Sequence, residues 1–135
     1  MTDPELPFPS GPFVDHLGLR ITEVAADRVV ATWTAGERHH QPYGIVHGGV
    51  HASVVETLGS LGSAVWASEH LAEGTKVVGV HNSTDFFRAV SEGDLVSTGT
   101  PVHQGRSQQL WVIETRDAQD RLVARGQLRV QNLSS

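Results

Sequence analysis

Cysteine is absent from the 135 residues of this chain, which excludes a disulfide scaffold, thiolate metal ligands and a cysteine nucleophile. Basic residues are scarce as well: 10 Lys and Arg stand against 15 Asp and Glu, and the net charge of −5 leaves no basic surface for nucleic acid. No uncharged apolar run approaches the roughly 20 residues of a membrane-spanning helix. The acidic, proline-rich start lacks the basic and apolar regions of a secretory signal. The sequence therefore predicts a cytoplasmic protein without nucleic-acid or membrane partners.

The length is that of one domain, and a chain of this size can bury about two thirds of its unfolded surface without disulfides. Four of the six prolines fall within residues 1–12. Because proline lacks the backbone N–H that helices and sheets use, we expect this segment to be a flexible N-terminal arm. Residues 13–133 are then expected to form a single domain.

Hydrophobic periodicity divides the domain into one long helix and several strands. From Gly49 to about Leu71 the apolar residues recur with a period of 3.6, which predicts a helix with one narrow apolar stripe. The stripe consists of Val50, Val54, Leu58, Leu61 and Val65. Alternating patterns predict a hairpin over residues 19–33 before the helix and strands over 75–88, 95–102, 109–116 and 121–131 after it. One helix against one antiparallel sheet predicts an α+β fold in which a curved sheet wraps around a central helix.

Small residues occupy the helix face opposite this stripe. They are Ala52, Ser53, Gly59, Ser60 and Ser63, and Glu56 lies among them. Glu56 is either a solvated helix carboxylate or a functional group in a crowded setting. Gly59 and Gly62 each cost the helix roughly 0.8–1 kcal/mol relative to alanine. Close approach by another backbone or by a ligand would explain both glycines.

The sequence His47-Gly48-Gly49 precedes the predicted helix. Glycines at a helix start leave backbone N–H groups unshielded at the positive end of the helix dipole. Such groups stabilise an oxygen that develops negative charge in a transition state. A plain glycine-rich turn into a helix would have the same sequence, so these three residues alone do not decide the function.

Histidine is unusually frequent, with eight residues in the chain. His47 and His51 are four residues apart, the spacing of a helical metal pair, but the glutamate of an HExxH motif is missing. Glu56 lies about 140° around the helix from His51, so the three side chains cannot converge on one ion. The other histidines are expected at the surface or in loops, namely His16, His39, His40, His70 and His103. We predict no metal site and no cofactor.

The segment HQPYGIVHGGVHASVVETLGS resembles the hotdog-fold acyl-CoA thioesterases of the PaaI-like family. Members carry an amide residue six positions before an HGG and an acidic residue nine positions after its histidine. Gln41 and Glu56 hold these positions relative to His47. This pair is typical of the Gln/Glu subtype and is similar to the hydroxybenzoyl-CoA and dihydroxynaphthoyl-CoA thioesterases. The resemblance covers about residues 12–132. It implies a hotdog fold and hydrolysis of an acyl-CoA or aryl-CoA thioester to the free acid and CoA.

The resemblance also implies a role for each residue of the motif. The Gly48 N–H, helped by the Gln41 amide, would receive the oxygen of the thioester carbonyl, and His47 would orient the loop or the carbonyl. Glu56 would either attack the carbonyl to form an anhydride or activate a water molecule. Ser60, one helical turn further, would hold that water or the carboxylate.

Residues for coenzyme A follow from the same resemblance. Relatives use arginine and Ser/Thr for the nucleotide at the turn where this chain has Arg106 and Ser107, and Arg88 closes the long strand before it. Asn82 holds the position of a histidine found in some relatives, with His81 beside it. Glycine-turn N–H groups and cations suit phosphate, although an arginine in a hairpin turn can equally be a solvated side chain.

The predicted sheet has long edge strands, which closed symmetric pairing would protect. The sequence therefore predicts a homo-oligomer, either a dimer or a dimer of dimers (a homotetramer). The family resemblance implies that two sheets join edge to edge and that the active sites lie at the subunit interface.

Two other functions stay open from the sequence. An acyl-thioester hydratase or dehydratase shares a similar fold, but its signatures differ from HGG and the acidic residue nine positions later. A non-catalytic acyl-CoA-binding protein needs an output element, for which 135 residues leave no room. The side chains of Val50, Val54, Phe86 and Phe87 predict an apolar or aromatic acyl pocket.

Overall fold

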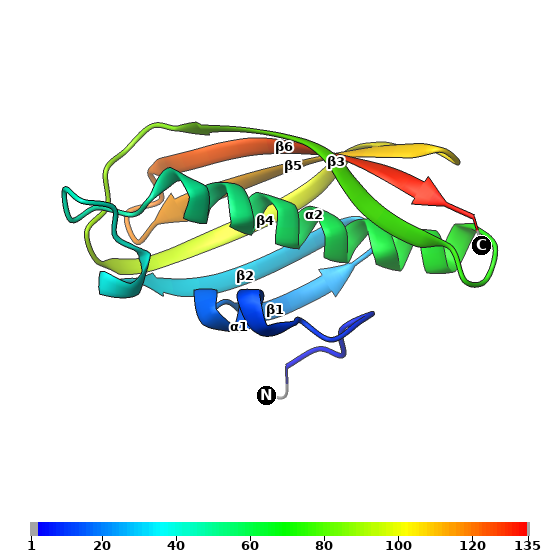
Figure 1. Cartoon of the computed structure of the whole chain (residues 1–135), viewed down its shortest axis with the longest axis horizontal. Coiled ribbons are helices and arrows are strands. Elements are labelled where there is room, and N and C mark those ends of the chain that lie inside the picture. Colours follow the sequence, from blue (N-terminus) through cyan, green and yellow to red (C-terminus); the bar gives the residue numbers. More distant parts are fainter. Residues whose placement is uncertain (1–2, 135) are drawn as a thin grey trace.

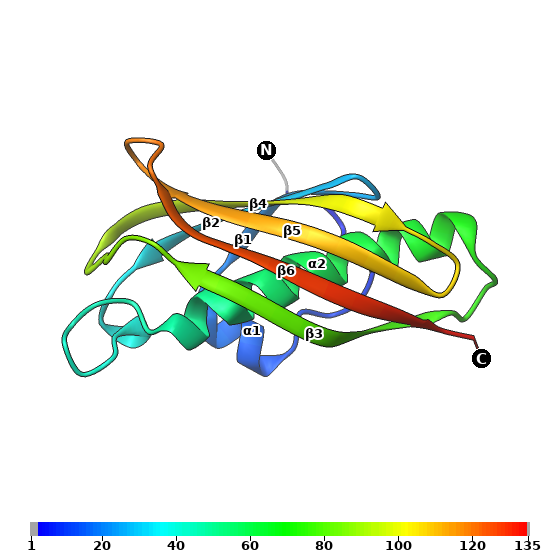
Figure 2. The same ribbon diagram turned by 90° about the horizontal axis from the view of Figure 1, so that it is seen from above.

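A computed structural model describes residues 3–134. Six antiparallel strands form one curved sheet in the order β1-β2-β4-β5-β6-β3, and the long helix α2 lies against its inner face (Figure 1). The elements are α1 (Pro12–Leu17), β1 (Arg20–Ala25), β2 (Arg28–Ala35), the 3-10 turn η1 (Glu37–His39), α2 (Gly48–His70), β3 (Lys76–Phe86), β4 (Gly93–Gln104), β5 (Gln108–Asp117) and β6 (Leu122–Leu133). Strands cross over α2 when the molecule is seen from above (Figure 2). The predicted α+β hotdog, with one central helix, is confirmed.

Helix α2 begins at Gly48, one residue before the predicted start. His47 caps this end: its backbone is extended, and its ring Nδ1 accepts a hydrogen bond from the Gly49 N–H at 2.8 Å. At the other end Leu71 leaves the helical conformation, and Gly74, with a φ of 84°, supports the turn into β3. Within residues 3–134 no helix is long and apolar enough to cross a membrane.

The predicted apolar stripe of α2 faces the sheet. Val54, Leu58 and Leu61 are buried in the main hydrophobic core. Val50 and Val65, at the two ends of the stripe, are only partly buried. The buried surface of α2 is wider than the predicted stripe and also includes Val55, Ser63 and Ala67, because the sheet curves around the helix.

The two interior glycines of α2, Gly59 and Gly62, are explained by core side chains rather than by a backbone or a ligand. A Cβ atom on Gly59 would lie 2.6 Å from Cδ2 of Leu128, and a Cβ atom on Gly62 would overlap the indole ring of Trp111. Both partners belong to the sheet and are fully buried. The helix therefore accepts its two unfavourable glycines so that large side chains of β5 and β6 can pack against its axis.

The edges of the sheet are β1 and β3. On β1 the residues Arg20, Thr22 and Glu23 are exposed and polar. On β3 the exposed residues include Val78 and Val80, whose side chains are 42% and 54% accessible. Among residues 3–134 strand β3 pairs only with β6, so its other side presents backbone groups that no described strand pairs, next to exposed valines. This combination is typical of an edge that pairs with another strand.

Candidate active site

A cavity of about 690 Å³ lies along α2 and combines three parts of the fold. The predicted small-residue face of α2 contributes Ser53, Glu56 and Ser60. Strand β3 contributes Asn82 and Phe86, and the third wall is formed by the chain before β1. Hydroxyl, amide and carboxylate groups on one side therefore face apolar side chains on the other, an arrangement common in small-molecule sites.

Glu56 is exposed to this cavity and lies against the backbone of β3. A Cβ atom on Gly79 would be 3.7 Å from Cδ of Glu56. No side chain among residues 3–134 forms an ion pair with Glu56. Ser60 lines the same cavity about 6 Å further along the helix axis. The carboxylate is therefore accessible and has no ion-pair partner among these residues, which suits a nucleophile or general base.

Gly48 lies at the N-terminus of the same helix, eight residues before Glu56. At 1.5 Å per residue the two positions are about 12 Å apart along the axis. Reacting groups need a separation of roughly 3 Å from the atom they act on. The Gly48 N–H and the Glu56 carboxylate of one chain therefore cannot act on the same carbonyl. The ring of Phe86 packs over Gly48 and leaves no space for a side chain there.

The loop before α2 fixes the orientation of the Gln41 amide. Its Oε1 accepts a hydrogen bond from the Tyr43 N–H, and a backbone N–H can pair only with the oxygen of the amide. The backbone N–H groups of Gln41 and Gly44 pair with the carbonyls of Ile45 and Gln41 at 2.8 and 3.0 Å, and Gly44 has a φ of 77°. The turn thus leaves the NH₂ group of Gln41 available as a donor. Gln41, His47 and Gly48 do not line the cavity that contains Glu56.

Asn82 lines the cavity, but its amide is already engaged. Its Nδ2 donates to the carbonyl of Ala52 on α2 at 2.8 Å, and its Oδ1 accepts from the Thr84 hydroxyl at 2.7 Å. Asn82 therefore ties the edge strand β3 to α2. His81 is exposed and lies outside the cavity lining. A contact of either residue with substrate stays a prediction.

Arg106 and Ser107 are exposed in the turn between β4 and β5. The buried side chain of Asn132 holds this turn: its Nδ2 donates to the carbonyls of Gly105 and Arg106 at 2.8 and 3.1 Å. Gln109, also buried, donates to Oδ1 of Asn132 at 3.1 Å. Neither amide is among the residues predicted from the sequence, although a polar residue at an inward position of an alternating strand is a recognisable signal.

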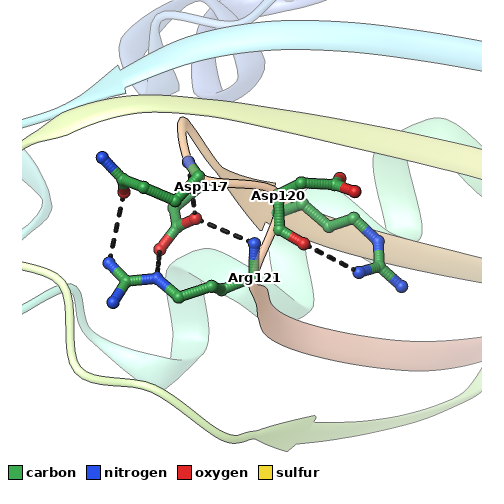
Figure 3. A network of polar contacts seen from close by, with 5 residues as sticks. Asp117, Asp120 and Arg121 are labelled. Atoms are coloured by element: carbon green, nitrogen blue, oxygen red, sulfur yellow. Dashed lines mark hydrogen bonds and ion pairs between the residues drawn. The ribbon is translucent and has the colours of Figure 1, made fainter.

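Arg88 lies in a second cavity, of about 370 Å³, at the opposite end of β4. The twelve residues of β4 separate it from Arg106 by about 40 Å, so one chain does not bring the two arginines together. Asp117 and Arg121 face each other across this cavity wall, with Arg121 Nε donating to Asp117 Oδ2 at 2.8 Å (Figure 3). Burial by itself raises the pKa of Asp117, but hydrogen bonds from Arg121 and Gln119 outweigh it and hold that pKa below the usual value.

Two histidines are buried, and only for His39 does this differ from the sequence prediction. His39, expected at the surface or in a loop, follows β2 in the turn η1 but is only 3% exposed. Its Nδ1 accepts from the Gly36 N–H, and its Nε2 bonds the carbonyl of Leu17 at 2.8 Å. His51 is 3% exposed as well, and its ring lies between those of Trp33 and Phe86. Among residues 3–134 no group of three or more candidate ligands is placed to hold a metal ion.

Of the four residues predicted to form the acyl pocket, one lines the cavity that contains Glu56. Phe86 lines the cavity, whereas Val50 is partly buried against the core and Val54 is fully buried within it. Phe87 is exposed and lies outside the lining. The apolar wall comes instead from the chain before β1, because this segment folds back over α2.

The sequence profile described as Thioesterase superfamily matches residues 43–124. The chain is 44% identical to the protein Rv1847 of Mycobacterium tuberculosis, over 92% of this chain and 88% of the relative. It is 39% identical to the proofreading thioesterase EntH of Cronobacter turicensis, over 82% and 78%. The crystal structure of AziG from S. sahachiroi matches 94% of this chain and all of its own with a TM-score of 0.88 at 47% identity.

The matched profile covers more than half of the chain and includes all of α2. It begins two residues after Gln41. The relatives agree with it over most of their own lengths. The fold, with its single helix in a curved sheet, is the same in the solved relatives. The chain therefore belongs to the thioesterase superfamily and is a thioester hydrolase.

Proposed function

We propose that this hydrolase acts on an acyl-CoA thioester, with aryl-CoA esters among its substrates, and that Glu56 is its catalytic carboxylate. The observation that carries the proposal is the accessible, unpaired carboxylate of Glu56 in the cavity beside Ser60. It lies beside the edge strand β3, about two turns of α2 away from the N–H groups that would stabilise an oxyanion.

The separation of Glu56 from Gly48 supports an active site shared between two copies of the chain. Strand β3 has a free edge with exposed valines, and the carboxylate lies against its backbone at Gly79. Pairing two β3 strands about a two-fold axis would join two sheets and place α2 of each copy beside α2 of the other. In such a dimer the carboxylate of one copy meets the helix N-terminus of its partner, and two dimers can assemble further into a tetramer.

The chemistry follows from these positions. The thioester carbonyl oxygen is held by the Gly48 N–H and by the free NH₂ of Gln41, which stabilise the negative charge that develops there. Glu56 then either attacks the carbonyl carbon and releases the CoA thiolate, forming an anhydride that water hydrolyses, or removes a proton from a water that attacks. Ser60 orients the carboxylate or that water, and His47 holds the start of α2 in place.

Coenzyme A is assigned to the turn between β4 and β5. Arg106 supplies a cation and Ser107 a hydroxyl on an exposed turn that Asn132 holds in shape, and phosphate groups are bound by such donors. Arg88 lies at the other end of the sheet, so it can take part only if a second copy brings it near the nucleotide. The cytoplasmic location stays a prediction from the sequence.

Free-thiol release from a panel of aryl-, medium- and long-chain acyl-CoAs tests the activity. Glu56→Gln keeps the shape of the side chain but removes the nucleophile and base, so we expect kcat to fall by at least about 100-fold. Glu69→Gln, an exposed position on the same helix outside the cavity, is the matched control and should be unchanged. If Glu56→Gln keeps more than about a tenth of the wild-type kcat, Glu56 is not the catalytic carboxylate.

Subunit mixing tests the shared site. In a dimer of one Glu56→Ala and one Gln41→Ala subunit, one of the two sites regains both residues. We therefore expect partial recovery of activity on mixing two inactive variants. Absence of recovery in demonstrably mixed dimers would place the whole site within one chain. Tight binding of acyl-CoA by the wild type without thiol release would favour a non-catalytic binding protein.

A further inference from the structure

The chain before β1 forms the apolar wall of the cavity that contains Glu56. Leu6 and Phe8 of the N-terminal arm (residues 3–11) and Phe13 of α1 line this cavity opposite the serines and asparagine described above. The arm and α1 lie beside β1, on the side of α2 away from β3 (Figure 1). Leu6 and Phe8 thus come from the segment predicted to be a flexible arm, whereas Phe13 is the first residue of the predicted domain.

Several contacts hold the arm in this place. Leu6 packs against the hydrophobic core. The carboxylate of Asp3 pairs with Arg20 of β1 at 3.0 Å, and the Ser10 hydroxyl donates to Asp15 of α1 at 2.5 Å. Prolines fix φ near −65°, so the proline-rich arm loses less conformational entropy on docking than an ordinary segment would. A wall of this kind is preformed and does not need substrate to order it.

The end of α1 is attached to the rest of the fold independently of the arm. The carbonyl of Leu17 bonds the buried ring of His39 at 2.8 Å, and the carbonyl of His16 accepts from Arg38 at 3.3 Å. Helix α1 therefore has a fixed position relative to β2 and η1. Phe13, on the first turn of that helix, is held at the cavity even though its side chain is 64% exposed.

We propose that Phe8 and Phe13 form the acyl-binding wall and select bulky apolar acyl groups over short ones; this inference rests on the proposed function. Both rings line the cavity, yet they are 39% and 64% exposed in the single chain. An acyl group whose carbonyl lies at Glu56 extends into the same cavity and covers apolar surface that is otherwise in water. The proposal requires that an octanoyl or benzoyl group extends to this wall and that a two-carbon acyl group does not.

The test compares Phe8→Ala and Phe13→Ala with wild type on octanoyl-CoA, benzoyl-CoA and acetyl-CoA. Truncating an aromatic contact in a specificity pocket should lower kcat/KM for the better of the two bulky substrates by about tenfold. The value for acetyl-CoA should stay within about twofold, because that group does not contact the wall. Glu5→Ala is the matched control, since Glu5 is an exposed arm residue outside the lining and should change neither value.

Three results would overturn the assignment. An equal loss for bulky and short substrates would show that the arm only supports the fold. Unchanged selectivity in both variants would show that neither ring contacts the acyl group. A change in molecular mass by light scattering would show that the rings belong to a subunit interface.

A binding measurement separates this proposal from the proposed function. In the Glu56→Gln background, calorimetry with octanoyl-CoA and acetyl-CoA gives the two dissociation constants without turnover. Phe8→Ala and Phe13→Ala should reduce the preference for octanoyl-CoA by about tenfold in this background too. If wild type fails to hydrolyse any thioester but the preference in binding shifts as expected, the proposed function fails while the acyl wall stands. If wild type hydrolyses acyl-CoA but the two phenylalanine variants leave the binding preference unchanged, the proposed function stands and the acyl wall fails.

Discussion

His51 lies one turn into α2 with its ring against Trp33 and Phe86, at centroid distances of 5.9 and 6.0 Å. Its Nδ1 has no hydrogen-bond partner among residues 3–134. Burial, together with the nearby His39, lowers the pKa of His51 to about 4 from the ordinary 6.5. The neutral imidazole therefore behaves as an aromatic core residue, and protonating it requires a charge to enter the core.

This pKa predicts how stability depends on pH. The unfolded chain protonates His51 below about pH 6.5, whereas the folded chain does so only near pH 4. Above pH 6.5 His51 is neutral in both states and does not make the free energy of unfolding depend on pH. As the pH falls from 6.5 to 4, protonation of His51 in the unfolded chain lowers the free energy of unfolding. A difference of 2.5 pKa units corresponds to about 3 kcal/mol. Urea unfolding at pH 7.5 and pH 4.5 measures the loss of unfolding free energy between these pH values in wild type and in His51→Leu.

The variant should show a clearly smaller loss between the two pH values than wild type. His16→Leu, an exposed histidine on α1, is the control and should keep the wild-type difference. An equal pH dependence in wild type and His51→Leu would show that other groups cause the acid sensitivity.

At the scale of elements, β6 extends beyond the first residue of β5, and its last residues contact the turn between β4 and β5. Asn132 near its end bonds the carbonyls of Gly105 and Arg106, and its backbone N–H donates to the carbonyl of Ser107 at 2.8 Å. Gln109 connects the same amide to the carbonyl of Ser63 on α2 at 3.1 Å. The proposed phosphate-binding turn is thus coupled to the helix that carries the carboxylate.

Removing Asn132 should affect both stability and coenzyme A binding. Asn132→Ala removes the donor to the carbonyls of Gly105 and Arg106 and one of the two acceptors of the Gln109 NH₂ group, so we expect a loss of about 1–3 kcal/mol in unfolding free energy. Asn132→Asp can still accept from Gln109 but cannot donate to Gly105 and Arg106. Because the nucleotide is remote from the reacting carbonyl, both variants should raise KM for acyl-CoA and leave kcat nearly unchanged.

Arg106→Ala provides the comparison for this prediction. It should raise KM in the same way without reducing stability, since its side chain is exposed. A truncated thioester without the nucleotide should be hydrolysed equally by wild type and all three variants. Equal losses on that substrate would show that the turn acts elsewhere than on the phosphates.

At the scale of the whole molecule, the two edges of the sheet differ in character. The β1 edge is polar, whereas β3 combines unpaired backbone groups with Val78 and Val80 and holds Gly79 against Glu56. Assembly through β3, as proposed, would both cover an apolar edge and complete the proposed active site. Oligomerisation and catalysis should be lost together.

Val80→Asp tests this coupling by placing a charge at the β3 edge. We expect a lower mass by light scattering at micromolar concentration and a parallel loss of thiol release, because like charges would face each other across the two-fold axis. Thr22→Asp places the same charge on the β1 edge, where it should change neither property. Full activity in a demonstrably monomeric Val80→Asp protein would contradict a site shared between subunits.

The sequence by itself determined the features that depend on residues close together in the chain. The period of 3.6 located α2 to within a residue at each end, and alternation located the strands, because periodicity reflects which face of an element is buried. The spacing of Gln41 and Glu56 from His47 carried the resemblance to thioesterases. Part of the predicted small-residue face lines the cavity with Glu56, whereas Gly59 and Ser63 of that face are buried.

Only the tertiary structure decided which distant segments meet. Composition predicted a separate, flexible arm, whereas docking places Leu6 against the core and Phe8 in the cavity. His39 follows a strand in an apparent loop but is buried because the carbonyl of Leu17 returns to it from α1. Asn132 bonds a turn 26 residues earlier in the chain. Such contacts depend on how the sheet curves and where its ends return, and no local period or composition records them.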